Sequence, residues 1–142
     1  LSRGLGDVYK RQAYGYIRQG TVYMAFKYIR KNEIQKAEET LKLTKKINWL
    51  SKTQRGYYYF VKGFVDTARG RIEEAKSAYE EALNIGLRLS NDTALAYANL
   101  ASLHNRQKNK VKARECIKKA QQEKKIKKNI LSEIERIEAM IG

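Results

Sequence analysis

The residue types that most often carry chemistry are scarce and scattered in this chain. His104 is the only histidine and Cys116 the only cysteine, and the two are twelve residues apart. An ordinary metal site needs more ligands of these types, and a Cys–His nucleophile needs an acid that orients the base, which is not evident here. We therefore expect His104 to be a packed histidine and Cys116 to be a small buried residue.

The paired glutamates of the chain do not have the arrangement of a general acid and base. Glu73-Glu74 and Glu80-Glu81 fall on a stretch with helical periodicity, where such charges form ion pairs on the surface. The chain also has no glycine-rich loop of the kind that cradles phosphates. We therefore predict that the chain is not an enzyme and that it binds no cofactor and no metal ion.

A strong positive charge is the most marked feature of the composition. The formal net charge is +15, and residues 105–128 hold eleven lysines and arginines against two glutamates. Such a surface attracts polyanions through counterion release, but the aromatic residues with which single-strand binders stack bases are absent from 105–128. We expect a solvated outer face. Nucleic acid, acidic protein tails and anionic membranes stay open as partners, with nucleic acid less favoured than protein. The basic patch of this hypothesis comprises Lys108, Lys110, Lys112, Arg114, Lys118 and Lys119.

The elements that must position these residues are predicted to be helices. Proline is absent, no alternating β pattern occurs, and the longest apolar run is far too short to span a membrane. Ser51 and Gln54 have the spacing of a capping box, and Ser90-Asn91-Asp92 offers oxygens that could cap a helix from Thr93. The predicted helices cover 13–30, 33–48, 71–89, 93–106 and 109–123. A further helix starts at the capping box, carries 57–68 and ends at Gly70, and an isoleucine stripe predicts a last helix over 126–141.

Small and large side chains recur along the chain with a period of 38 residues. The recurring marks are Ala37, Leu41 and Thr44; then Ala75, Tyr79 and Ala82; then Ala113, Ile117 and Ala120. A small residue precedes each set by twelve positions, at Ala25, Gly63 and Ala101. A fixed period of about this length predicts a stacked array of helical hairpins.

These marks resemble the tetratricopeptide repeat. Its aromatic and small positions match Tyr59, Gly63, Ala75, Tyr79 and Ala82 in the middle repeat, and Tyr97, Leu100, Ala101, Ala113, Ile117 and Ala120 in the third. The first repeat is weaker, no repeat ends in proline, and Lys62 and Asp66 stand where leucine and tyrosine are usual. The resemblance implies an all-α fold: an alpha-alpha superhelix, a solenoid with three hairpins at about 13–50, 51–88 and 89–125 and a C-terminal capping helix at 126–142.

The resemblance further implies a scaffold whose first helices line a concave groove for a protein or peptide. The groove residues that the repeat register predicts are Val22, Phe26, Ile29, Tyr57, Phe60, Phe64, Ala98, Ser102, Asn105 and Arg106. Packing of these aromatics against neighbouring repeats alone is an equal alternative. The family's clamp on a terminal carboxylate is not expected, because its positions hold Val22, Phe26, Val61, Leu95 and Asn99. We expect Trp49 to pack between hairpins.

Residues 2–12 resemble the in-frame translation of a transposase sequencing adapter, and we expect residues 1–12 to be non-native. The chain is then expected to be a fragment of a larger microbial protein. The sensor or interaction part of a bacterial transcriptional regulator is an alternative to a free-standing scaffold, and a basic adaptor for a polyanion is another. The single cysteine fits a reducing compartment, and we expect a cytoplasmic location.

Overall fold

The computed structural model describes residues 20–142, and within this range every regular element is a helix. The α-helices are α2 (Thr21–Arg30), α3 (Ile34–Lys42), α4 (Lys52–Ala68), α5 (Ile72–Ile85), α6 (Ser90–Arg106), α7 (Lys110–Gln121) and α8 (Lys128–Ile141), and a short 3₁₀ helix, η1 (Ile47–Trp49), precedes α4. No helix in this range is both long and apolar enough to cross a bilayer.

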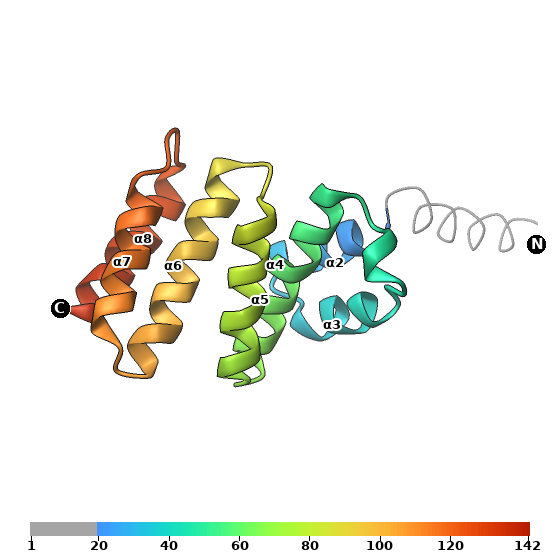
Figure 1. The fold of residues 1–142 in the computed structure, drawn as a ribbon, viewed down its shortest axis with the longest axis horizontal. Helices are drawn as coiled ribbons and strands as arrows, with labels where there is room; N and C mark the ends of the chain where they lie inside the picture. The colour runs from blue at the N-terminus through green and yellow to red at the C-terminus, as the bar shows by residue number, and fades with distance from the viewer. Residues whose placement is uncertain (1–19) are drawn as a thin grey trace, which may run out of the picture.

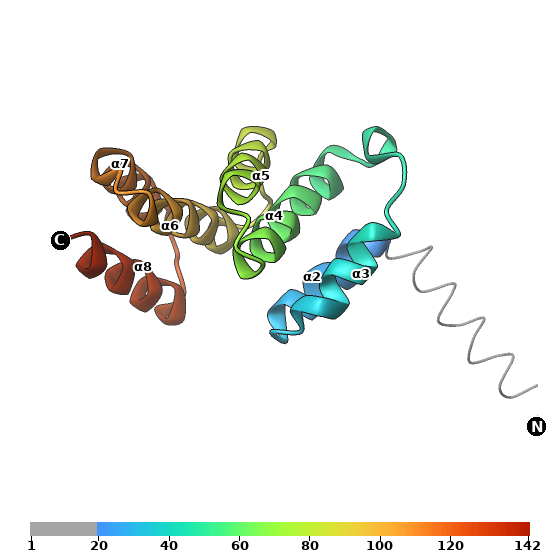
Figure 2. The same cartoon turned by 90° about the horizontal axis from the view of Figure 1, so that it is seen from below.

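Neighbouring helices pair as antiparallel hairpins, and the hairpins stack side by side (Figure 1). α2 pairs with α3, α4 with α5 and α6 with α7. α4 packs against both helices of the preceding hairpin, and α8 packs in the same way against α6 and α7. Figure 2 shows that the row is curved, with α2 and α8 on the same side of it. The predicted all-α solenoid is confirmed.

Two helix boundaries in the first hairpin differ from the prediction. α2 begins at Thr21, because Gly20 has a φ of 81° that an α-helix does not accept. Residues 1–12, and the predicted helical residues 13–19, lie outside the described part of the chain. α3 ends at Lys42 rather than near Asn48, and Lys46 turns the chain with a φ of 57°.

The connection between α5 and α6 also differs from the prediction. α5 stops at Ile85, because Gly86 has a φ of 103°, and α6 already begins at Ser90. The side chains of Asn91 and Asp92 therefore do not cap this helix. Both bind neighbouring helices instead, as described below. The capping box of α4 is present: the Ser51 hydroxyl accepts from the Gln54 N–H at 3.2 Å, and the Gln54 side chain accepts from the Ser51 N–H.

The core consists of two apolar clusters that share Phe26. One joins α2, α3 and α4 and includes Ala25, Ala37 and Val61, all without solvent exposure. The other runs from Phe60 through α5, α6 and α7 to α8. Phe26 packs against both clusters, so the core is continuous along the row.

Small residues set the distance between paired helices. A Cβ atom on Gly63 of α4 would lie 2.7 Å from Cε1 of Tyr79, which belongs to α5 and has no exposed surface. A methyl group therefore does not fit between the α4 backbone and this ring. The pair fixes how closely α4 and α5 approach each other.

The last helix closes the row through its isoleucine stripe. Ile134, Ile137 and Ile141 are buried in the second cluster. Polar contacts hold both ends of α8: Asn91 accepts from the N–H of Lys127, and Arg114 donates to the carbonyl of Gly142. α8 begins at Lys128, two residues later than the predicted 126, so Ile126 lies in the connection before it.

Replacing Gly63 by alanine should destabilise the fold, although alanine is the better helix former by about 1 kcal/mol. We expect Gly63→Ala to lower the free energy of unfolding by roughly 1–3 kcal/mol, because overpacking moves the Tyr79 ring or the helix. Urea unfolding followed by circular dichroism measures the change.

A double-mutant cycle identifies the cause of that loss. In a Tyr79→Leu background, the Gly63→Ala change should cost less than in the native background, because the opposing ring is gone. The exposed Ser77→Ala change in α5 serves as control. An equal cost of Gly63→Ala in both backgrounds would show that the contact with Tyr79 does not set the helix spacing.

Candidate functional site

Two adjoining hollows form one groove along the row of helices. Each has a volume of about 460 Å³, and both are lined by Phe26, Arg30, Leu89 and Asp92. We call their union the inner groove. Its lining residues are Val22, Tyr23, Phe26, Ile29, Arg30, Thr53, Gln54, Tyr57, Phe60, Phe64, Arg88, Leu89, Asn91, Asp92, Leu95, Lys127, Asn129 and Ile130. These residues come from α2, α4, α6, the start of α8 and the connections before α6 and α8.

Interlocked aromatic rings form the floor of the inner groove. The Phe26 ring lies edge-on to Tyr57 with centroids 5.3 Å apart, and Phe60 contacts Phe64 at 5.1 Å. Phe60 also contacts Tyr79 at 6.3 Å and is only 1% exposed. Such edge-to-face pairs contribute to stability beyond the area they bury. The floor therefore belongs to the core as well as to the groove.

The predicted groove residues of the first two repeats line the inner groove, but they do not contribute equally. Phe26, Ile29, Tyr57 and Phe64 are half-buried and keep surface that faces the groove. Val22 and Phe60 are buried and can act only as floor, because little of either reaches solvent.

The predicted residues of the third repeat lie elsewhere. Ala98 is 0% exposed in the core, which corrects its assignment to a partner surface. Ser102, Asn105 and Arg106 do not line the inner groove. The register of α6 is the physical reason, because its first turns, with Asp92 and Leu95, face α4 and α8. The residues that complete the groove there are Leu89, Asn91, Asp92, Leu95, Lys127, Asn129 and Ile130.

Asp92 and Asn91 tie the third repeat to its neighbours across the inner groove. The Tyr57 hydroxyl donates to Oδ2 of Asp92 at 2.6 Å. Burial and the bond to this carboxylate raise the pKa of Tyr57 well above its usual value. On the other side, Oδ1 of Asn91 accepts from the N–H of Lys127 at 2.9 Å. Adjacent side chains of α6 thus hold both α4 and the start of α8.

The rim residues of the groove were not predicted from the sequence, because the prediction considered only the first helix of each repeat. Leu89 is 54% exposed and lies in the connection between α5 and α6, where a large apolar residue directly before the polar run Ser90-Asn91-Asp92 is a usable signal. Tyr23 is 46% exposed. The rim cations Arg30, Arg88 and Lys127 come from separate elements, so no local spacing could have grouped them.

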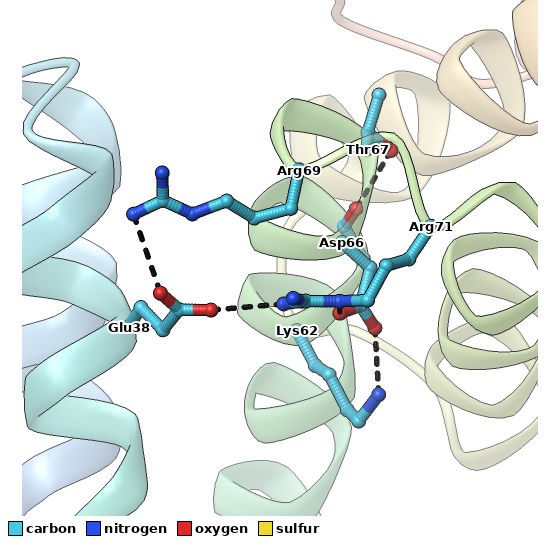
Figure 3. Close-up of polar contacts among 7 residues, drawn as sticks. Glu38, Lys62, Asp66, Thr67, Arg69 and Arg71 are labelled. Atoms are coloured by element: carbon cyan, nitrogen blue, oxygen red, sulfur yellow. Dashed lines mark hydrogen bonds and ion pairs between the residues drawn. The ribbon is translucent and has the colours of Figure 1, made fainter.

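An ionic network fixes the first hairpin against the second (Figure 3). Glu38 of α3 binds Arg69 at 3.3 Å and Arg71 at 2.8 Å. Nε of Arg71 also donates to Asp66 at 2.8 Å, and Lys62 binds the other oxygen of Asp66 at 2.6 Å. The hydrogen bond from Arg71 lowers the pKa of Glu38. Because α2 is paired with α3, this network also helps to hold α2, which forms one wall of the inner groove.

The residues of the basic patch are all exposed but do not share one face of α7. Arg114 donates to the carbonyl of Gly142 and lies on the α8 side. Nζ of Lys119 lies 5.8 Å from the Tyr97 ring centroid and is therefore on the α6 side. The structure thus spreads the patch around the outer half of α7 instead of concentrating it.

The residues first considered for chemistry are buried. His104 is buried beside Lys76 and Lys112, and burial, reinforced by these cations, lowers its pKa. Burial raises the pKa of Cys116 to about 11. Among residues 20–142, no three His, Cys, Asp or Glu side chains gather closely enough to hold a metal ion.

Trp49 is 79% exposed and does not pack between hairpins. The reason is that α3 ends early, and the Trp49 ring instead lies under Nζ of Lys46.

Comparison with known proteins bears on the repeat architecture directly. Residues 57–122 match the family model of the tetratricopeptide repeat. This segment belongs to the tetratricopeptide repeat family. It covers α4 from Tyr57 through α7, and the match confirms the resemblance found in the sequence. The hairpin of α2 and α3 lies outside the match but packs against the tetratricopeptide segment through α4. No significant match to a curated protein or to a solved structure was found.

Neutralising Asp66 should weaken the junction between the first two hairpins. Asp66 is 3% exposed and holds two cations, so Asp66→Asn leaves buried polar groups with poorer partners. We expect the free energy of unfolding to fall by roughly 1–3 kcal/mol. Thermal unfolding with the exposed Glu74→Gln as control checks this, and equal behaviour of the two variants would rule out a structural role for the network.

Acidification should destabilise the protein through His104. A folded-state pKa below about 6.5 means that the unfolded chain binds the proton more readily. Stability is therefore full above about pH 6.5 and decreases as the pH falls through this value towards the folded-state pKa. Urea midpoints between pH 7.5 and 5.5 measure the loss. His104→Leu should be almost flat over this range, and the same slope in both proteins would contradict the assignment.

Proposed function

We propose that the chain is a protein- or peptide-binding scaffold that holds its partner in the inner groove. The observation that carries the proposal is the set of half-exposed aromatic and aliphatic side chains, contributed by α2, α4 and α6, that lines this groove. Tetratricopeptide repeats are interaction modules, and the inner groove is the surface of this chain best suited to hold a partner.

The groove suits recognition by preordered helices. Its floor is braced by ring contacts and continues into the core, so binding orders few groups and costs little side-chain entropy. Tyrosine and phenylalanine offer large contact areas with few rotatable bonds. A hollow of about 460 Å³ on each side of Phe26 accepts a few large apolar side chains of a helix or an extended segment.

No chemical step is part of this proposal. Among the described residues that line the groove, Asp92 carries the one carboxylate, and it accepts a hydrogen bond from the Tyr57 hydroxyl. We propose a non-catalytic scaffold in a reducing compartment such as the cytoplasm, which the single cysteine supports.

A polyanion adaptor is the second candidate function. In favour of it, all six residues of the basic patch are exposed, and within the described residues none of them takes part in an ion pair. Against a specific site, the patch is spread over both flanks of α7 and has no aromatic residue of its own. The inner groove therefore remains the better supported site.

Removing exposed apolar side chains from the groove rim should weaken binding. The probe is the tightest peptide selected from a random 12-residue display library on the native chain. We expect Tyr23→Ser combined with Leu89→Ser to weaken its Kd roughly tenfold or more, as for truncated anchors in other interfaces. Fluorescence polarisation measures the affinity.

The control for this experiment is equally apolar and exposed but lies outside the groove. Val111 and Met140 are 66% and 57% exposed, and neither lines the inner groove. Val111→Ser combined with Met140→Ser should leave the affinity unchanged. Equal weakening by both double variants, or none by either, would show that the groove is not the binding site. Phe60 is unsuitable for such a test, because its removal would damage the core.

A further inference from the structure

We propose that the occupant of the inner groove is an acidic, apolar protein segment. Its apolar side chains lie on the aromatic floor, and its side-chain carboxylates lie against Arg30, Arg88 and Lys127 at the rim. This inference rests on the proposed function and adds the chemical class of the partner.

The rim cations bracket the groove from three separate elements. Arg30 lies in the last turn of α2 and lines both hollows, Arg88 comes from the connection before α6, and Lys127 immediately precedes α8. The Arg30 guanidinium lies 5.9 Å from the Phe26 ring centroid, which directs this charge over the floor. Among the ion pairs of residues 20–142, none involves these three side chains.

The groove contains little negative charge of its own. Within residues 20–142, Asp92 is the one carboxylate that lines either hollow, and its Oδ2 accepts a hydrogen bond from the Tyr57 hydroxyl. Asp92 also lies in the first turn of α6, where the helix dipole offsets part of its charge. The remaining polar lining residues are the neutral Thr53, Gln54, Asn91 and Asn129. The described lining therefore carries three cations against one carboxylate and presents a net positive charge to an occupant.

The positive charge of the groove rim is a local feature and does not simply reflect the net charge of +15. Elsewhere on the same repeats the lining is acidic: a separate hollow beside Tyr59 and Lys62 is bordered by Glu73, Glu74 and Glu81. The carboxylates of α5 thus lie on a surface that does not border the inner groove. Charge complementarity of this kind selects partners and speeds their association more than it raises affinity.

The recognition differs from a clamp on a terminal carboxylate. The positions of such a clamp hold Val22, Phe26, Val61, Leu95 and Asn99. Val61 is buried, and Nδ2 of Asn99 donates to the Tyr79 hydroxyl. Acidic side chains within the segment, rather than a free C-terminus, therefore supply the negative groups that meet the rim.

Two designed libraries test the partner class with the native chain. Both display 12-residue peptides with C-terminal amides, one randomised among Leu, Phe, Ser and Glu and the other among Leu, Phe, Ser and Gln. We expect binders mainly from the Glu library, and the best of them should lose roughly tenfold in affinity when its glutamates become glutamines. The affinity should also decrease when the NaCl concentration is raised about tenfold, from 50 to 500 mM, because salt screens exposed charges.

Charge reversal locates the effect. Arg30→Glu, Arg88→Glu and Lys127→Glu together should abolish binding of the selected Glu peptide. Lys110→Glu, Lys112→Glu and Lys118→Glu change the net charge equally on α7, outside the groove rim, and should leave at least about a third of the affinity. Circular dichroism confirms that both variants keep the native helix content.

The outcomes separate the two proposals. One outcome is that peptides from the Gln library bind as tightly as those from the Glu library and still require Tyr23 and Leu89. That result would contradict an acidic partner but would leave the groove as the binding site. Binding that falls equally with the α7 reversal would show attraction of polyanions by the whole surface and would overturn this inference. Peptide binding that is insensitive to Tyr23 and Leu89 would overturn the groove itself.

Discussion

Gly63 lies against the ring of Tyr79 with no room for a methyl group, and the spacing of the central hairpin depends on this contact. Because α4 and α5 approach closely there, Tyr79 reaches across to Phe60 and Phe64 on α4. The same ring accepts a hydrogen bond at its hydroxyl from Asn99 of α6. One small residue therefore lets one large residue connect two repeats, and the floor of the inner groove is built on that connection.

The junction between the first two hairpins works differently. Its apolar cluster is small, and the ionic network of Glu38, Asp66, Arg69 and Arg71 runs alongside it. Asp66 and Lys62 stand where the repeat pattern usually has apolar or aromatic residues. The buried Asp66 carboxylate therefore binds Lys62 and Arg71 at a position where an apolar side chain would otherwise pack. Such contacts specify orientation more than they add stability. The position of α2 as a groove wall thus rests on this network together with the apolar cluster that joins α2, α3 and α4, whereas α6 is held by the second apolar cluster and by Asp92 and Asn91.

Sequence periodicity predicts what is local and repeated. The spacing of Ala37, Ala75 and Ala113 predicted the hairpins, since a residue buried in every repeat leaves a regular signal, and all three have no exposed surface. It could not predict where the surface of the third repeat lies, because that depends on how α6 is rotated against α4 and α8. Ala98 was therefore misplaced, and the partners of Asp92 and Asn91, 35 and 36 residues away, were missed. Trp49 was misplaced because nothing in its neighbourhood showed that α3 ends early.

The residues of the groove floor are buried or half-buried in the core, whereas those of the rim are exposed. Phe60 cannot vary freely, since it packs against Phe26, Phe64 and Tyr79 at once. The floor is therefore constrained by folding, and its apolar character comes with the solenoid whatever the partner is. Arg30, Arg88 and Leu89 are exposed and contribute little to the core, so substitutions there should have a small cost in stability. If the inner groove binds a partner as proposed, discrimination among apolar partners must arise at helix ends and connections, which is where the rim cations of this chain lie.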